Sequence, residues 1–558
     1  MHGGMADLTM VYDLVHTSRK RHMQIHAALL SVVLVATPVP AARAAAAEPG
    51  WVTSVHDGIS LTTRRTPVAV TPSPGKGVAT RSDFDGDGRD DVAVYSDDGF
   101  IVQYSSAPYR DDLRVVEYGS VVCSCAGAPS VAGDFDGDGY DDLVLGNYYE
   151  QDTSAGVTAG AVWVFPGGPD GLRLEAVQHF NQSTAGVPGS SEKGDGMGLA
   201  LAAGDLTGDG RDDLAIGVPL EGIGSAADAG GVIVLRGSAA GLTATGAQWI
   251  DQGTSGVPGS PEKDDYFGWG LAIGKVDKNN YADLVVGTPL ENEHDLSDGS
   301  GMLTQFWGGA SGVSLSKVTA VNGADITHGA HTKGTYIFDI GYWIGIVDTD
   351  GDGYGEVIAG DPWGEVDNDI PGLVASFAGR SSGLSASGVK ILSQDTSGVP
   401  GGNELNDFFG RGIAVGDVTG DGLGDVLVGV PGEDIGSTVD AGSVVLLRGS
   451  STGLSGAEAQ ELDQSSASVP GSAESNDGFG AAVTLLNLDG SGPLEALVGT
   501  PREEVGGDDK GYPSGTVTAF PAGAKGLGLG VTTTGKSLVP ADERILSYGY
   551  ALVGPQGS

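Results

Sequence analysis

The sequence predicts an all-β fold, a β-propeller of seven blades with four antiparallel strands in each, and eight blades are the alternative. Three observations support this prediction. The 558 residues include 96 Gly and only 6% aromatic side chains, a composition typical of many short strands and turns. One acidic loop recurs at intervals of 51, 71, 70, 73, 69 and 70 residues. Short apolar runs accompany every copy, and a fixed period with strand-like segments in each unit is typical of a repeat architecture.

The elements of one unit follow in a constant order. An apolar or aromatic residue followed by Gly stands eight residues before the loop from the second unit onward, and we expect the inner strand between them. A continuous apolar run such as Leu214-Ala215-Ile216 follows the loop and predicts a strand buried on both faces. Five units end this strand at Gly-x-Pro, since Pro cannot pair within a sheet. A third strand such as Val232-Ile233-Val234-Leu235 and a less regular fourth strand complete the unit.

Residues 1–44 are predicted to form a signal peptide. Arg19-Lys20-Arg21 precedes an apolar run from Ala27 to Val35, and Ala42-Arg43-Ala44 fits the small-x-small cleavage pattern. The alternative is a membrane anchor, but the run is shorter than the roughly 20 residues that a span requires. We therefore expect a secreted or cell-surface protein with no transmembrane segment after cleavage.

The rest of the chain is divided by the start of the repeats. We expect residues 45–74 to form an N-terminal segment that closes the ring, with Trp51 to Val70 as an outer strand of the last blade, and residues 75–558 to form the propeller. Tyr548 to Val553 restart the inner-strand pattern, which leaves eight blades open. For Cys123 and Cys125, a strained disulfide and two free thiols are equal alternatives.

The charge of the chain excludes one class of partner. The formal net charge is -44. Nucleic-acid binding needs a basic surface that neutralises phosphates, so we expect no nucleic-acid partner.

The acidic loops predict calcium sites. The first runs from Asp83 to Asp91 between two strands, without the helices and twelfth-position Glu of an EF-hand. Carboxylates at positions one, three, five and nine, with Gly at positions four and six, bring hard oxygens around one centre, which favours Ca²⁺. Thr supplies a neutral oxygen in two loops, Glu takes the ninth place in another, and we expect backbone carbonyls to ligate at the seventh positions. The predicted ligands are Asp83, Asp85, Asp87, Arg89 and Asp91; Asp134, Asp136, Asp138, Tyr140 and Asp142; Asp205, Thr207, Asp209, Arg211 and Asp213; Asp348, Asp350, Asp352, Tyr354 and Glu356; and Asp417, Thr419, Asp421, Leu423 and Asp425.

The loops that begin at Lys275 and Asn487 are degenerate. We expect the first to hold no calcium, with the Lys275 ammonium pairing with Asp277 and Asp283 in place of the ion. The alternative is that Lys275 points to solvent. The occupancy of the loop at Asn487 is left open.

The combination of Phe-Gly, a D-x-D-x-D-G loop and Gly-x-Pro resembles the FG-GAP repeat of the integrin α-subunit propeller. The resemblance covers most of the chain from about Gly75 and is best at residues 197–289 and 409–501. The first unit departs from it, being shorter and lacking Gly-x-Pro. The resemblance implies a seven-bladed propeller with calcium in the inner hairpin of some blades, and it implies no single activity.

From these observations we expect a secreted, monomeric, calcium-binding module for an extracellular protein or glycan. An extracellular hydrolase or lyase on a propeller and a purely structural surface protein are the alternatives. We identify no catalytic residues and no organic cofactor site. The two G-x-S-x-G stretches, from Gly379 and from Gly449, occupy a turn that other units fill without Ser, and no helix follows as a nucleophile elbow requires.

A second set of acids recurs in the segments between blades. Val-Pro-Gly is followed by a Glu and an Asp at Glu192 and Asp195, and in three further units. We expect these acids to cap or hydrogen-bond between blades, because a ligand site normally breaks the symmetry of a repeat. The symmetry-breaking loops Glu291 to Gly299 and Asn322 to Thr335 are therefore the expected ligand sites.

Overall fold

The computed structural model describes residues 51–56, 58–68, 81–96, 99–105, 107, 109–115, 129–291, 300–329, 335–337, 339–366, 370–504 and 515–534. The predicted signal peptide, both Cys residues, the Tyr548 restart, residues 292–299 of one expected ligand loop and residues 330–334 of the other lie outside these residues. Within the described part of the chain, no helix is both long enough and apolar enough to cross a membrane.

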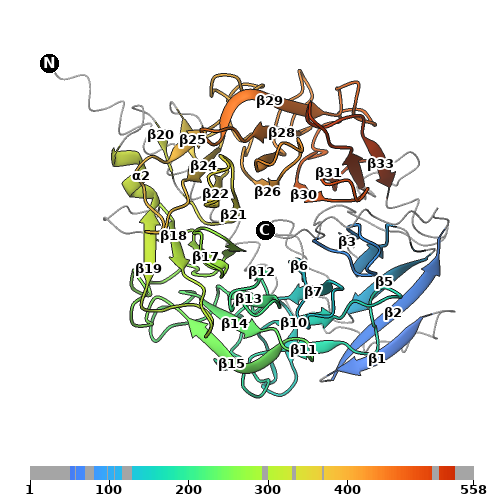
Figure 1. Cartoon of the computed structure of the whole chain (residues 1–558), viewed down its shortest axis with the longest axis vertical. Helices are drawn as coiled ribbons and strands as arrows, with labels where there is room; N and C mark the ends of the chain where they lie inside the picture. The colour runs from blue at the N-terminus through green and yellow to red at the C-terminus, as the bar shows by residue number, and fades with distance from the viewer. Residues whose placement is uncertain are drawn as a thin grey trace, which may run out of the picture.

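Seven antiparallel sheets stand around a central axis, which confirms the seven-bladed propeller (Figure 1). Six of them have four strands that follow the chain from the axis outward. Blade 2 holds β6 (Ser130–Gly133), β7 (Asp142–Asn147), β10 (Ala161–Phe165) and β11 (Gln178–Phe180); blade 3 holds β12 (Leu201–Gly204), β13 (Asp213–Val218), β14 (Gly231–Arg236) and β15 (Thr243–Ile250); blade 4 holds β16 (Gly270–Gly274), β17 (Asp283–Thr288), β18 (Met302–Phe306) and β19 (Val318–Asn322). Blade 5 holds β21 (Trp343–Val347), β22 (Glu356–Asp361), β24 (Leu373–Phe377) and β25 (Lys390–Leu392); blade 6 holds β26 (Gly412–Gly416), β27 (Asp425–Val430), β28 (Ser443–Arg448) and β29 (Ser455–Asp463); blade 7 holds β30 (Ala482–Leu486), β31 (Glu495–Thr500), β32 (Thr516–Phe520) and β33 (Val531–Thr534).

Smaller elements lie in the connections. Strands β8 (Gln151–Asp152) and β9 (Val157–Thr158) pair with each other, as do β20 (Thr335–Tyr336) and β23 (Glu365–Val366). The short helix α2 (Gly323–Gly329) follows β19, so the connection between blades 4 and 5 departs from the repeat.

The first blade has five strands, in the order β1-β2-β5-β4-β3. Strands β3 (Val92–Ser96), β4 (Gly99–Gln103) and β5 (Tyr109–Val115) are extended outward by the hairpin of β1 (Val52–His56) and β2 (Ile59–Pro67). The prediction that this hairpin adds to the last blade was therefore wrong. The physical reason is charge pairing along the β2–β5 edge, where Arg64 contacts Asp112 at 2.9 Å and Arg65 contacts Asp111 at 2.7 Å.

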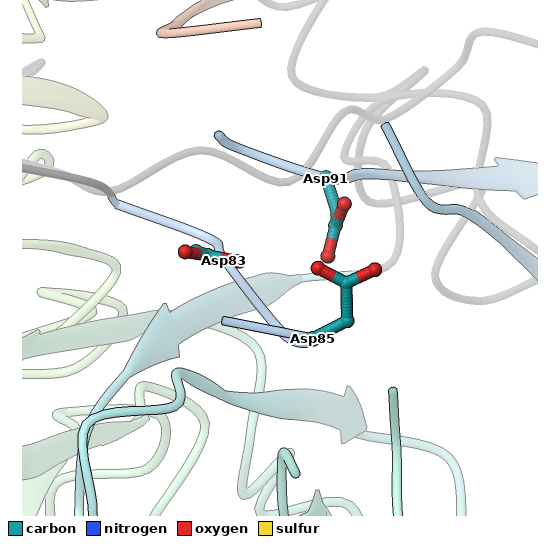
Figure 2. A group of neighbouring side chains, drawn as sticks. All are labelled: Asp83, Asp85 and Asp91. Atoms are coloured by element: carbon teal, nitrogen blue, oxygen red, sulfur yellow. The ribbon is translucent and has the colours of Figure 1, made fainter. Parts of the chain in front are cut away.

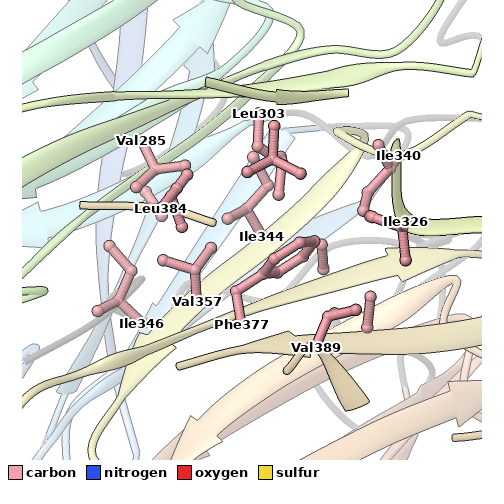
Figure 3. Close-up of a cluster of buried hydrophobic side chains, with 14 of the residues drawn as sticks. Val285, Leu303, Ile326, Ile340, Ile344, Ile346, Val357, Phe377, Leu384 and Val389 are labelled. Atoms are coloured by element: carbon pink, nitrogen blue, oxygen red, sulfur yellow. The ribbon is translucent and has the colours of Figure 1, made fainter. Parts of the chain in front are cut away.

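The hydrophobic core lies between neighbouring blades. In blades 2 to 7 the second strand of the blade is buried along its whole length, since its sheet packs against a neighbouring blade on both faces. Figure 3 shows one such layer, in which Val285 and Leu303 of blade 4 meet Ile344, Val357 and Phe377 of blade 5. The predicted second and third strands are confirmed as the layers of this core.

The ring closes between blade 7 and blade 1, which are neighbours in Figure 1 although they come from opposite ends of the described chain. Val94 and Ile101 of blade 1 pack with Leu486, Leu497 and Val517 of blade 7 in one buried cluster. This seam brings the acidic loop at Asp83 beside the degenerate loop at Asn487.

Candidate metal centres

From blade 2 onward the acidic loops connect the innermost strand to the second strand, and the first loop runs directly into β3. In the second loop, Gly137 and Gly139 have φ of 75° and 87°, a conformation that side chains with a Cβ rarely adopt. These two Gly residues let the chain fold back on the first carboxylate. The loops therefore form as tight turns whose carboxylates converge.

The first-position Asp holds the turn. Asp134 accepts hydrogen bonds from the backbone N–H of Gly137 (2.7 Å), Asp138 (3.2 Å) and Gly139 (3.0 Å). The third-position carboxylate of Asp136 accepts from the N–H of Asp138 at 3.0 Å. The same pattern of donors to the first position recurs at Asp205, Asp348 and Asp417.

The ninth-position acid ties the loop to the rest of its blade. Asp142 accepts from the N–H of Phe135 at 3.2 Å and from the N–H of Gly167, which follows the third strand, at 2.8 Å. Asp91, Asp213, Glu356 and Asp425 make corresponding pairs of contacts. A carboxylate has about four acceptor positions, so these acids keep capacity for a cation.

Three loops bring carboxylate oxygens close enough to share one ion. In each, three ligand atoms lie within 4.8 Å of one another. The trios are Asp83, Asp85 and Asp91; Asp134, Asp136 and Asp138; and Asp348, Asp350 and Glu356. Figure 2 shows the first, in which the Asp85 and Asp91 carboxylates face each other.

The electrostatics of the first loop favour a cation. Burial, together with the charges of Asp85 and Asp87, raises the pKa of Asp83 to about 7. Burial also raises the pKa of Asp91 well above its ordinary value. A bound divalent cation would lower these pKa values again, because it stabilises the charged carboxylates that burial disfavours.

The seventh-position residues have a role that explains why they share no side-chain type. The side chains of Tyr140, Arg211 and Leu423 pack over the fourth-position Gly of the preceding loop, and Tyr354 packs against Lys278, which takes that position in the fourth loop. Arg211 would lie 3.2 Å from a Cβ added at Gly137, and Leu423 would lie 2.8 Å from one at Gly351. The backbone N–H of Tyr140 and Arg211 donates to the fifth-position carboxylate of its own loop at 3.1 Å. Ligation by the carbonyls of Arg89, Tyr140, Arg211, Tyr354 and Leu423 stays a prediction.

The fourth loop corrects one prediction. Lys275 is exposed and forms no ion pair with Asp277 or Asp283, so the expected compensation by this ammonium was wrong. Asp277 instead accepts from Trp307 Nε1 at 3.0 Å and lies 4.0 Å from Lys317 Nζ. Both partners belong to later parts of blade 4, so the pattern of the loop itself gave no sign of them.

The eighth-position residues were missed by the sequence analysis. Their N–H groups donate to the first-position carbonyl of the preceding loop all around the ring, and the bond from Asp90 to Asn487 closes it at 3.0 Å. Three eighth-position carboxylates reach back in the same direction. Asp90 accepts from the N–H of Asn487 at 2.6 Å, Asp141 from Asp83 at 2.8 Å and Asp212 from Asp134 at 3.1 Å. The seven loops therefore form one hydrogen-bonded ring.

A second feature lies at the opposite end of the blades from the acidic loops. Five half-buried aromatic side chains of blades 4 and 5 contact one another in a chain, and we call them the aromatic platform. Ring centroids are 5.3 Å apart for Tyr266 and Trp269, 5.4 Å for Trp269 and Tyr342, and 5.2 Å for Tyr342 and Trp363. Trp343 lies 5.4 Å from Tyr342 and 5.9 Å from Trp363. Because no other blade repeats this set, the platform breaks the symmetry of the ring.

These features define a class of protein, a propeller with acidic hairpin loops in an FG-GAP pattern. Residues 127–165, 197–235 and 409–447 match the FG-GAP repeat family. The chain is 31% identical to integrin alpha-3 of Cricetulus griseus over 193 residues, which are 34% of this chain and 16% of that protein. It is 32% identical to integrin alpha-PS2 of Drosophila melanogaster over 213 residues, which are 37% of this chain and 14% of that protein. The protein is thus a seven-bladed propeller with three segments that match the FG-GAP repeat, and it is similar to integrin α subunits, of whose length its matches span about a sixth.

Among solved structures, the rhamnogalacturonan lyase PL11 of Bacillus licheniformis is 12% identical, with 73% of this chain and 74% of that chain covered. Its TM-score is 0.29, so this likeness carries no argument about activity.

Proposed function

We propose that this protein is a secreted, calcium-stabilised module that binds an extracellular protein or glycan. Calcium would occupy the acidic loops, because their donors are hard oxygens and their carboxylates are partly buried. The first, second and fifth loops are the best supported, since each gathers three carboxylates within 4.8 Å. The third and sixth loops replace one acid by Thr207 or Thr419 and would bind at lower charge.

The observation that carries the binding proposal is the aromatic platform. Tyr and Trp give large contact areas at little entropic cost and are enriched where proteins hold ligands. The residue after Phe-Gly or its equivalent is Trp269 in blade 4 and Tyr342 in blade 5, but Leu199, Arg411 and Ala481 in blades 3, 6 and 7. A surface confined to two neighbouring blades suits one ligand, whereas the acidic loops serve the whole ring.

The test is a binding screen with the purified chain against glycans and cell-surface proteins, in calcium and in chelator. We expect Trp269→Ala and Trp363→Ala to lower the affinity for the ligand at least tenfold without lowering the melting temperature of the ligand-free protein by more than a few degrees. Trp249→Ala on the outer strand β15 is the matched control and should leave binding unchanged. Equal losses in all three variants would contradict the platform, and the absence of any ligand would favour a purely structural protein.

A further inference from the structure

Four connections between blades carry the same set of polar residues at fixed spacing. A Gln at the end of one blade is followed after 10 residues by a Glu, after 13 by an Asp and after 39 by a second Glu that lies beyond the second strand of the next blade. We call each set a junction cluster. The clusters are Gln182, Glu192, Asp195 and Glu221; Gln252, Glu262, Asp265 and Glu291; Gln394, Glu404, Asp407 and Glu433; and Gln464, Glu474, Asp477 and Glu503.

In the cluster between blades 2 and 3 the acids converge. Carboxylate oxygens of Glu192, Asp195 and Glu221 lie within 4.8 Å of one another. Gln182 Nε2 donates to Glu221 Oε2 at 3.0 Å, and the N–H of Glu192 donates to Asp195 Oδ2 at 2.5 Å. Ser190 Oγ donates to Glu192 Oε1 at 3.0 Å. The expected capping role of Asp195 is therefore confirmed, but it uses only part of the cluster.

A second observation points to a ligand. The four Gln side chains are 2–6% exposed, and each holds its amide against the last Glu of its cluster. In all four the amide oxygen Oε1 is buried and has no hydrogen-bond partner. Asp265 Oδ1 in the second cluster is buried and unpaired as well. Leaving a buried oxygen unsatisfied costs about 1–3 kcal/mol, and a cation is a partner that both an amide oxygen and a carboxylate accept.

Among the described residues, no positively charged side chain takes the place of that cation at the first cluster. The charged neighbours that raise the pKa of Asp195 are Glu192 and Asp228, after burial, and the result is a pKa of about 6. Burial and the charges of Asp195 and Glu192 also raise the pKa of Glu221. Within the described residues, no Lys or Arg forms an ion pair with these three acids. The protein therefore gathers three acids here without a positive group.

Blades 2 and 5 provide comparisons within the same chain. Glu150 takes the place of the last Glu in blade 2, where the connection lacks the other three residues, and it accepts from Asn147 (2.9 Å), Trp163 (2.7 Å) and His179 (2.5 Å). Blade 5, whose connection also departs from the repeat, has Gly364 at this place. Where the other cluster residues are missing, the last Glu is thus either hydrogen-bonded by donors of the protein, as in blade 2, or replaced by another residue, as in blade 5.

The Gly of Val-Pro-Gly makes room for the Gln amide. Gly189 has φ of 93°, and a Cβ added there would lie 2.7 Å from Gln182 Nε2. The corresponding distances are 2.6 Å at Gly401 and 2.9 Å at Gly471. The recurring tripeptide therefore serves to seat the Gln side chain against the acids.

We propose that the junction clusters are a second set of divalent-cation sites, suited to Ca²⁺, that join successive blades at the end of the propeller opposite the acidic loops. Three carboxylates and one amide oxygen are the hard ligands that Ca²⁺ prefers, and water or backbone oxygens complete its six to eight positions. The ligands come from two blades and from the segment between them, so a bound ion fixes the angle of one blade against the next. This inference does not depend on calcium in the acidic loops.

The experiment counts calcium in the full chain after stripping with EGTA and dialysis against calcium alone. The double variant Glu221→Gln with Glu291→Gln should hold two ions fewer than the parent by atomic absorption. Asp136→Ala should lose one ion of its own, and combining the three changes should lose three, since the two kinds of site are separate. Glu150→Gln is the matched control for removing a buried Glu and should lose none.

A second measurement does not depend on the folding of variants. Crystals of the parent protein soaked in terbium should show anomalous peaks between Gln182, Asp195 and Glu221 and at the equivalent place in blade 4. An unchanged calcium count in the double variant, or junctions without peaks in crystals whose acidic loops are filled, would overturn the proposal.

Discussion

Removing the Asp90 carboxylate should open the propeller at the seam between blades 7 and 1. Asp90 is fully buried and accepts hydrogen bonds from the N–H groups of Arg81 (2.5 Å), Ser82 (2.9 Å) and Asn487 (2.6 Å). Arg81 Nη1 also reaches Val415 O of blade 6 at 3.0 Å. Asp90 and Asn487 are 397 residues apart, so no short connection holds this pair of blades together.

The size of the expected loss of stability follows from the groups that Asp90→Ala leaves without a partner. A hydrogen bond to a charged group contributes about 1.5–3 kcal/mol, and Asp90 accepts three such bonds from backbone N–H groups. Burial lowers the pKa of Arg81 while the charge of Asp90 opposes that effect, so the variant also removes a negative charge that stabilises the half-buried guanidinium. We expect a loss of about 3–5 kcal/mol in the free energy of unfolding. For a chain of 558 residues the entropy of unfolding is about 1 kcal/mol/K, so the melting temperature should fall by about 3–5 °C.

Asp141→Ala is the matched control. Asp141 occupies the same loop position and accepts the N–H of Asp83 at 2.8 Å, but it lies between blades 1 and 2, which are consecutive in the chain. We expect it to cost about 1–3 kcal/mol, because the N–H of Asp83 loses its partner, without opening the ring. Thermal unfolding measures both losses, and hydrogen exchange at the Asn487 amide reports opening of the seam. If Asp90→Ala unfolds like Asp141→Ala and the Asn487 amide exchanges as in the parent, the seam argument is wrong.

Three further predictions concern the cation and the acids. Calcium should raise the melting temperature relative to EDTA, since each site held at a hundredfold excess over its dissociation constant adds about 2.7 kcal/mol, and identical melting curves would contradict calcium binding. Asp136→Ala should lose one bound ion by atomic absorption, whereas Asp277→Ala in the fourth loop should lose none, and a loss in the second variant would show that this loop binds calcium after all. In chelator, the protein should become less stable between pH 5 and 8. Burial raises the pKa of Asp141 to about 8 and that of Asp212 to about 7, so the folded state keeps protons that the unfolded state loses. Their contribution is complete below pH 4 and is lost as the pH rises through 7–8, and urea titrations that show stability rising over this range would refute this assignment.

The repeats explain how much of the fold could be predicted. The acidic loop, the apolar run and Gly-x-Pro recur together, so the second strands of six blades and the third strands of five could be placed from the sequence, and β18 of blade 4 was missed. The hairpin of β1 and β2 has no counterpart in other units, and its partner β5 lies 46 residues further along the chain at Arg65 and Asp111. Edge pairing of that kind depends on charges that meet only in the folded protein, so the sequence pattern could not place it.

In the acidic loops too, the features that depend on local spacing could be predicted, whereas contacts with other parts of the chain could not. Convergence of odd-numbered acids followed from the spacing, because the Gly residues dictate the turn. The side chain of Lys275 could not be oriented in this way, since Asp277 is satisfied by Trp307 and Lys317 from outside the loop. The first three loops all have Asp at the eighth position, at Asp90, Asp141 and Asp212, and this recurrence is visible in the sequence. The role of these acids depends on the neighbouring loop, which only the fold places beside them. Likewise, Gln182 and Glu221 are 39 residues apart and only the fold brings them together.

Symmetry within the ring separates the two kinds of site. A cation that joins blades should recur wherever two blades meet in the same way, so repetition favours the junction clusters as structural sites, whereas a ligand-binding surface needs to occur once. The connection between blades 4 and 5 supports this division. It lacks the junction residues and contains α2 and β20 instead, and beyond the second strand of blade 5 Gly364 stands where other blades carry the last Glu, directly after Trp363. The platform spans this same junction through the contact of Trp269 with Tyr342. According to both proposals, the junction between blades 4 and 5 carries an aromatic surface in place of a structural cation site. Blades 4 and 5 are therefore the two blades that contact the ligand.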